Sequence, residues 1–191
     1  IAADVGGTKT HFMFADTENP GNIIYEARYK RGEFDGFERL VQSFLDESGA
    51  VHGQVDILTL ALPGLVSETS ATLTNLPWTI EKQFLKDSFG IKTVNFMNDF
   101  QASALGIGQL QEQDRILLNS GASGSYALKD NAIRVAVGAG TGLGVAWVRG
   151  GKFAAHAYDT EGGHIDFAPV DDTQIRLLQF LQQCYPHVSY E

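Results

Sequence analysis

Two short glycine-rich stretches contain the residue types that bind phosphate groups. The first, residues 4–10, reads Asp-Val-Gly-Gly-Thr-Lys-Thr and separates two apolar stretches with strand-like patterns. Because glycine tolerates positive φ angles and close approach of the backbone, N–H groups in such a turn can face phosphate oxygens. Asp4, at the end of the first predicted strand, is placed to hold a magnesium ion through water. The same pattern also fits a hairpin turn with nothing bound. The candidate phosphate-binding residues of this turn are Gly6, Gly7, Thr8, Lys9 and Thr10.

The second stretch, residues 138–144, reads Gly-Ala-Gly-Thr-Gly-Leu-Gly. Its glycine spacing differs from the dinucleotide-binding fingerprint, and a strand follows it where that fingerprint opens a helix. It is not a Walker loop either, because no Gly-Lys-Ser or Gly-Lys-Thr follows. Two strand–glycine–strand turns in one chain suggest two hairpins that clamp a polyphosphate from both sides. The candidate residues of the second turn are Gly138, Gly140, Thr141 and Gly142.

Asn98 and Asp99 stand between a predicted strand and a predicted helix. Ligands of α/β sheets bind where strands reach their carboxyl ends, so a carboxylate there is a candidate for chemistry. Asp99 can accept a proton from a substrate hydroxyl, and Asn98 can recognise a hydroxyl as donor and acceptor. The alternative role for Asp99 is a helix N-cap.

Glu161 and His164 flank a Gly-Gly turn and can converge on one ligand. A metal site that also includes His156, Asp159 and Asp166 is an alternative, although the spacing matches no standard zinc signature. A structural histidine at position 164 is the third interpretation.

Composition limits the classes of protein that fit. The 191 residues are 43% hydrophobic and 19% charged, which predicts a folded chain of one domain or two small ones. The net charge of −9 argues against a nucleic-acid or anionic membrane surface. Cys184 is the single cysteine, which excludes an intrachain disulfide and a multi-cysteine zinc site. Without an apolar run of about 18 residues or a visible signal peptide, we expect a soluble, cytoplasmic protein.

Hydrophobic periodicity predicts the elements that position these residues. A β-meander at the start is followed by alternating helices and strands, and a polar stretch at residues 109–114 predicts a division into domains 1–110 and 111–191. Asp171 is expected to cap the last helix together with Gln174. The residues expected to form the buried face of that helix are Ile175, Leu177, Leu178, Leu181 and Cys184. We predict strands at residues 1–5, 11–15, 23–29, 56–62, 92–97, 115–118, 132–137 and 143–148, and helices at residues 37–45, 80–88, 100–106 and 171–184.

Taken in their order along the chain, the motifs resemble those of the bacterial glucokinase family, which is part of the actin/hexokinase/Hsp70-like superfamily. The resemblance rests on residues 4–10, 62–64, 74–78, 98–100, 137–144, 161–169 and 187–191. It implies an α/β fold of the ribonuclease H-like class, with a mixed sheet that begins as a β-meander and a second domain that is incomplete. Family members are longer, so we expect a fragment that lacks the C-terminal part and is inactive alone. Lys9 departs from the asparagine often found after Thr8 in this family.

By this resemblance the whole protein is a glucokinase that transfers the γ-phosphate of ATP to the 6-hydroxyl of glucose. ATP and Mg²⁺ are the implied cofactors, Asp99 the base, and Asp4 the residue that holds Mg²⁺. The expected partners are glucose and ATP, with no nucleic acid and no membrane, and a homodimer is left open. The alternatives are a non-catalytic sugar-binding or regulatory relative, another hexose kinase, and a metal-dependent hydrolase. The implied glucose-binding residues are Asn98, Asp99, Glu161, His164 and Glu191.

Overall fold

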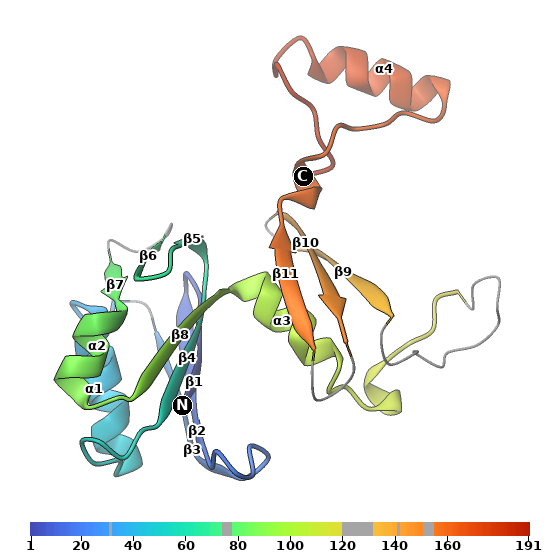
Figure 1. The fold of residues 1–191 in the computed structure, drawn as a ribbon. Helices are drawn as coiled ribbons and strands as arrows, with labels where there is room; N and C mark the ends of the chain where they lie inside the picture. The colour runs from blue at the N-terminus through green and yellow to red at the C-terminus, as the bar shows by residue number, and fades with distance from the viewer. Residues whose placement is uncertain (31, 74–77, 120–131, 141, 151–154) are drawn as a thin grey trace. The chain divides into compact units, whose positions relative to one another are not determined.

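The computed structural model describes residues 1–30, 32–73, 78–119, 132–140, 142–150 and 155–191. They form two compact units, Ile1–Asp99 and Phe100–Glu191, each built around its own sheet (Figure 1). One candidate residue, Thr141, lies outside the described residues.

The first unit contains a mixed five-stranded sheet in the order β3-β2-β1-β4-β8. The first three strands form the predicted antiparallel meander, and β4 and β8 continue the sheet parallel to β1. Parallel neighbours require crossover connections, which is why the helices follow the meander. The strands are β1 (Ala2–Val5), β2 (Lys9–Ala15), β3 (Ile23–Lys30), β4 (Ile57–Leu62) and β8 (Thr93–Asn98).

Two helices of this unit end at glycines. Helix α1 (Phe37–Ser48) is followed by Gly49 at φ 71°, and α2 (Lys82–Phe89) by Gly90 at φ 66°. Both angles lie in the left-handed region, where a glycine ends a helix without a Cβ penalty. The predicted start of α2 at residue 80 is too early, because Thr79–Glu81 form a short strand, β7.

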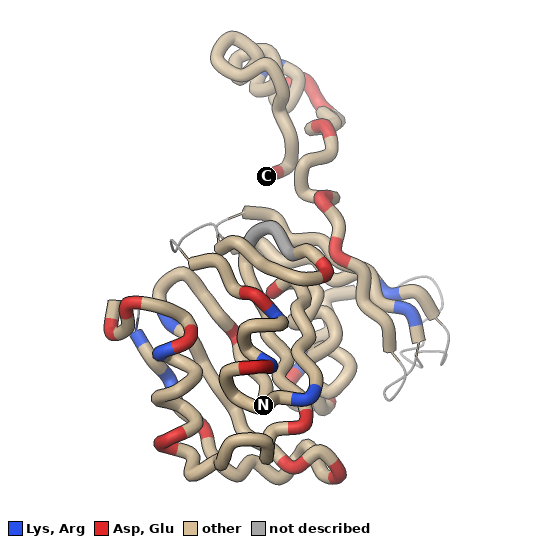
Figure 2. Tube along the Cα trace, turned by 60° about the vertical axis from the view of Figure 1, so that its left-hand side comes forward, with Lys and Arg blue, Asp and Glu red and all other residues tan. Residues whose placement is uncertain are grey.

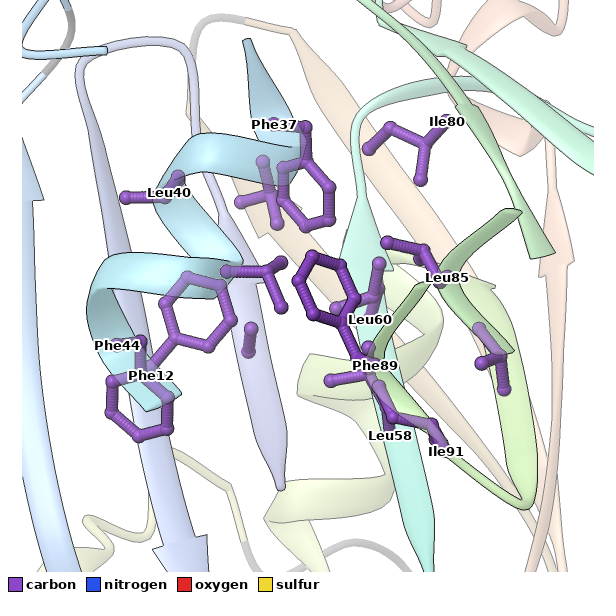
Figure 3. Packing of buried hydrophobic residues seen from close by; sticks show 14 of the residues in the cluster. Phe12, Phe37, Leu40, Phe44, Leu58, Leu60, Ile80, Leu85, Phe89 and Ile91 are labelled. Carbon is purple, nitrogen blue, oxygen red and sulfur yellow. The ribbon is translucent and has the colours of Figure 1, made fainter. Parts of the chain in front are cut away.

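The core of the first unit lies between the sheet and these helices (Figure 3). Phe12 of β2 is fully buried, and its ring stacks on Phe44 of α1 with centroids 4.8 Å apart. Leu58 and Leu60 of β4 and Leu85 of α2 belong to the same cluster. The alternation of β2 and the helical stripe of α1 therefore bury the residues that their periodicity selects.

Four strands were not predicted from the sequence. Three of them form a small sheet in the order β5-β6-β7 between β4 and α2. Strands of three to five residues contain too little alternation to be told from loop. They are β5 (Gly64–Val66), β6 (Ser70–Leu73), β7 and, in the second unit, β11 (His156–Thr160).

The predicted strand at residues 115–118 is wrong. These residues follow a short 3₁₀ turn, Glu112–Asp114, and form no strand. Ile116 and Leu118 are 88% and 93% exposed, and the described residues supply no ladder partner for them. An apolar run needs a neighbouring strand before its backbone pairs as sheet.

The second unit pairs a helix with an antiparallel sheet in the order β11-β10-β9. Helix α3 (Asp99–Ile107) packs Phe100, Ala104 and Leu105 against the small residues of β9 (Ile133–Ala139) and β10 (Leu143–Arg149). The units therefore divide after Asp99, earlier than the boundary at residue 110 that the polar stretch suggested, because α3 shares its core with the second sheet.

Helix α4 (Asp172–Leu181) begins with the predicted cap, since the backbone N–H of Gln174 donates to the Asp171 carboxylate at 2.8 Å. The Gln174 side chain accepts from the N–H of Val170 rather than completing a capping box. The predicted burial is wrong, because no residue of α4 is buried among the described residues, and Phe180 is 63% exposed. Periodicity decides which face of a helix is apolar, but burial requires another element to cover it.

The charged residues are distributed over the surface. Figure 2 shows acidic positions along many parts of the chain, with lysine and arginine positions among them. Within the described part of the chain, no helix is both long and apolar enough to cross a membrane.

A hydrogen-bonded cluster joins β3 to α1. The hydroxyls of Tyr25 and Tyr29 both donate to Oε2 of Glu47 at 3.0 Å, and Ser43 donates to Oε1 at 2.9 Å. The Ser43 bond, helped by the two tyrosines, lowers the pKa of Glu47 below its ordinary value of 4.5. Burial, and then the bond to Glu47, raises the pKa of Tyr29.

Replacing Glu47 by glutamine is expected to make the stability less dependent on acid pH. Since the pKa of Glu47 is lower in the folded state, its stabilisation is complete above pH 4.5 and is lost as the pH falls through the lowered pKa. Because the carboxylate is exposed, the loss at pH 7 should be about 0.5–1 kcal/mol. Urea unfolding of wild type and Glu47→Gln at pH 7 and pH 3 measures it, with Glu68→Gln as an exposed control. The prediction would be contradicted if the free energies of unfolding of wild type and Glu47→Gln differed by the same amount at both pH values.

Candidate functional site

The first glycine turn and the Asn98–Asp99 pair lie at the same edge of the first sheet. Strands β1, β4 and β8 are parallel, so their carboxyl ends meet at one edge. β1 ends at Val5, directly before the turn, and Asn98 pairs with Leu62 at the end of β4. Two inter-strand spacings, about 10 Å, separate β1 from β8. This edge is therefore wide enough to hold a phosphate group beside a hydroxyl group.

The first turn is a tight hairpin turn. The N–H of Gly6 donates to the carbonyl of Lys9 at 3.0 Å, and a Cβ on Gly6 would lie 3.0 Å from the same oxygen. Close approach of the backbone, rather than a positive φ angle, therefore calls for glycine at position 6. Thr8 and Lys9 are exposed, whereas Thr10 is only 4% exposed and points into the unit. Thr8 and Lys9 are thus the side chains of this turn that a ligand can reach.

Asn98 and Asp99 occupy the junction between β8 and α3. Asn98 is the last residue of β8 and is half-buried, and Asp99 is exposed in the first turn of α3. A negative charge in the first turn of a helix is favoured by the helix dipole. Asp99 is therefore a carboxylate at a helix N-terminus, directly after the carboxyl end of β8.

In the second unit, the structure brings Glu161, His164 and Glu191 together. The imidazole Nε2 of His164 lies 3.8 Å from a carboxylate oxygen of Glu161 and 3.5 Å from one of Glu191. A short 3₁₀ turn, Gly162–His164, places the first two residues on one side of the chain. All three side chains reach solvent, so the cluster presents hydrogen-bond acceptors beside an imidazole to a ligand.

A short antiparallel pairing fixes the backbone of Glu191. Its N–H donates to the carbonyl of Gly163 at 3.1 Å, and Phe167 N–H donates to the carbonyl of Val188 at 2.9 Å. The rings of Phe167 and Tyr190 meet edge to face with centroids 5.5 Å apart. The sequence offered no signal for this pairing, because it joins segments more than 20 residues apart through an isolated bridge, Asp166 to Ser189.

The glycines of the second turn have different surroundings. Gly138 and Gly144 face each other across the β9–β10 hairpin, and Cβ atoms on them would lie 2.5 Å and 2.6 Å from the Phe100 ring. Both are therefore required by packing. A Cβ on Gly140 would meet no atom within 4 Å, whereas one on Gly142 would overlap the carboxylate of Glu191. Gly140 is thus the most open described glycine of this turn.

The metal-site alternative finds no support in the described residues. Among them, no group of three or more histidine, cysteine, aspartate and glutamate side chains is arranged to hold a metal ion. Asp166, one of the residues of that alternative, pairs with Nε2 of His187 at 2.8 Å.

Comparison with known proteins identifies the family. The Glucokinase family model matches residues 1–191. The chain is 32% identical to a glucokinase of Colwellia psychrerythraea over 193 residues, which cover 100% of the chain and 56% of that protein. It is also 32% identical to a glucokinase of Nostoc punctiforme, over 95% of the chain and 52% of that protein. The chain therefore spans about half the length of the curated relatives it matches.

Solved structures share the fold. The crystal structure of a glucokinase from an Antarctic psychrotroph superposes with a TM-score of 0.81 at 26% identity, covering 100% of this chain and 58% of that one. A Balamuthia mandrillaris glucokinase in complex with glucose gives a TM-score of 0.68 at 21% identity, over 100% and 57% of the two chains. These likenesses confirm the predicted α/β fold of the actin-like, hexokinase-like class. Because the Glucokinase family model matches residues 1–191, the chain belongs to the glucokinase family.

Proposed function

We propose that the whole protein is a glucokinase of the cytoplasm, which transfers the γ-phosphate of ATP to the 6-hydroxyl of glucose. The observation that supports this most is the cluster of Glu161, His164 and Glu191 in a chain that belongs to the glucokinase family. The curated relatives named above are glucokinases, and the chain covers about half of each.

The proposed sugar-binding residues are groups that recognise hydroxyls. Carboxylates accept hydrogen bonds from hydroxyls, and an amide or imidazole can donate as well as accept. A sugar that lacks one hydroxyl leaves one such group without its partner, and this discriminates between sugars. The proposed glucose-binding residues are Asn98, Asp99, Glu161, His164 and Glu191.

Asp99 is the proposed base. It would orient the 6-hydroxyl and accept its proton as the oxygen attacks the γ-phosphorus, while the bond from that phosphorus to ADP breaks. In phosphoryl transfer, charge spreads over the phosphoryl oxygens, so positioning and backbone N–H donors supply most of the catalysis. The two glycine turns, residues 4–10 and 138–144, are the proposed donors to the phosphates of ATP.

Asp4 is the proposed residue for Mg²⁺. It is exposed at the end of β1, beside the first glycine turn. A single carboxylate fits this ion, because Mg²⁺ keeps several waters and binds proteins through one or two carboxylates together with substrate phosphates. When bound, the ion neutralises charge on those phosphates.

A coupled ADP-release assay on the intact protein tests the proposal. With ATP and Mg²⁺, we expect turnover on glucose, and kcat/KM lower by about tenfold or more for 2-deoxyglucose, which lacks one hydroxyl. Mannose and fructose complete the panel. Higher kcat/KM on another hexose would favour a different hexose kinase. Glucose binding by calorimetry without ADP release would favour the non-catalytic alternative and overturn the proposal.

A further inference from the structure

The carboxylate of Glu191 lies against two glycines, Gly142 and Gly163. A Cβ on Gly142 would overlap its Oε1 atom, and a Cβ on Gly163 would lie 2.9 Å from its Oε2 atom. The carboxylate therefore occupies space that side chains at these two positions would fill. Glycine at position 142 is what allows the Glu191 side chain to reach His164.

The two glycines differ in what else a side chain would meet. A Cβ on Gly163 would also overlap the carbonyl oxygen of Leu143, so the backbone would have to move. At Gly142, the three nearest atoms all belong to the Glu191 side chain, with Cδ at 2.8 Å and Cγ at 3.4 Å. Rotation of one side chain relieves that overlap. Gly142→Ala is therefore a change that acts on the carboxylate of Glu191.

The backbone of Glu191 is held while its side chain can respond. Its N–H bond to Gly163, the bridge between Asp166 and Ser189, and the Phe167–Tyr190 ring contact fix the main chain. A methyl group at position 142 would therefore turn the carboxylate away from its present place rather than shift the whole segment.

The charge at this point also separates Gly142 from the phosphate-binding role that the sequence suggested for it. A carboxylate in contact with Gly142 repels a phosphate anion at the same place. Gly142 therefore faces the sugar-binding cluster, whereas the N–H of Gly140 donates to the carbonyl of Gly142 within the turn.

We propose that Gly142 is a positioning residue of the sugar site. Because it has no side chain, it leaves room for the Glu191 carboxylate. This rests on the proposed function, in which Glu191 binds glucose. Gly142 would then act on the sugar through the carboxylate of Glu191.

The test is a comparison of KM values in the intact protein. We expect Gly142→Ala to raise KM for glucose by about tenfold and to change KM for ATP by less than about twofold. Gly106→Ala, in α3, is the matched control, because its Cβ would meet no atom within 4 Å and both KM values should stay unchanged. A rise confined to KM for ATP, or no rise in either, would overturn the proposal.

A double variant tests the contact itself. Glu191→Asp shortens the side chain by one methylene, so in the Gly142→Ala, Glu191→Asp protein the KM for glucose should lie well below the product of the two single effects. Effects that simply multiply would contradict the contact. If Gly142→Ala does not fold, adding Glu191→Ala should restore folding by circular dichroism, and persistent misfolding would overturn the proposal.

The proposed function and the role of Gly142 are tested by different measurements. Wild-type turnover on glucose tests that function, whereas the split between the two KM values tests the role of Gly142. If wild type releases no ADP, calorimetric glucose affinities of wild type and Gly142→Ala replace the KM comparison. Equal affinities, or no glucose binding by wild type, would then overturn the positioning role.

Discussion

Replacing Asp99 by asparagine in the intact protein is expected to lower kcat by about 10²–10⁴-fold, the contribution typical of a general base. Asparagine keeps the size and the hydrogen-bonding capacity of the side chain but cannot accept the proton of the 6-hydroxyl. KM for glucose should change little, because the other proposed sugar-binding residues remain. Asp99 is the first residue of α3, directly after β8, whereas Glu161, His164 and Glu191 come together within the second unit.

Steady-state kinetics at saturating ATP measure this effect, and calorimetry measures glucose binding to the variant. Asp87→Asn is the matched control, since it makes the same chemical change on the exposed face of helix α2, where the Asp87 carboxylate accepts a bond from Gln83. Near-normal turnover in Asp99→Asn would refute the assignment of the base. Loss of glucose binding in proportion to kcat would point to a role in binding alone.

Phe12→Ala should remove about 3–5 kcal/mol from the free energy of unfolding of the first unit. The Phe12 side chain is fully buried and packs on the rings of Phe44, Phe37 and Tyr29. Truncation leaves a cavity where the meander meets α1, and the rings around it cannot close the space without leaving their own contacts. Because domains are stable by about 5–15 kcal/mol, this single change should remove a large share of that stability.

Urea unfolding followed by circular dichroism measures the loss. The control is Phe84→Ala on α2, where the phenylalanine side chain is 47% exposed, and its cost should stay below about 1 kcal/mol. Equal losses at the two positions would show that the stack of Phe12 on Phe44 does not hold the meander to the helix.

Several elements could be predicted because their signals are local. The stripe of α1, the alternation around Phe12 and the glycines after the first two helices depend on residues within about one helical turn of each other. They predicted the meander and the helices of the first unit, whereas the mixed sheet was implied by the family resemblance. The motifs along the chain were also sufficient to indicate its family, which the match to the family model confirmed.

The predictions that were wrong depend on contacts between residues that are distant in the sequence. The apolar face of α4 and the run at residues 115–118 have the periodicity of buried elements, yet both are exposed among the described residues. The sequence pattern shows that a face is apolar, but not which element covers it. The division of the units was also missed, because α3 follows β8 in the chain but packs on the second sheet.

The candidate site shows the same difference between local sequence signals and tertiary contacts. The sequence alone determined which residue types are present and near which turns they stand, because glycine turns and strand ends are local features. Only the tertiary structure decided that Glu191 pairs back to Gly163, lies beside His164 and takes the space next to Gly142. Those contacts join residues about 30 to 50 positions apart, and they form only when the β9–β10 hairpin and the C-terminal segment pack around the same turn. The motif predicts that Gly142 binds phosphate, whereas the Glu191 carboxylate beside it in the structure is the basis for proposing that Gly142 positions this carboxylate.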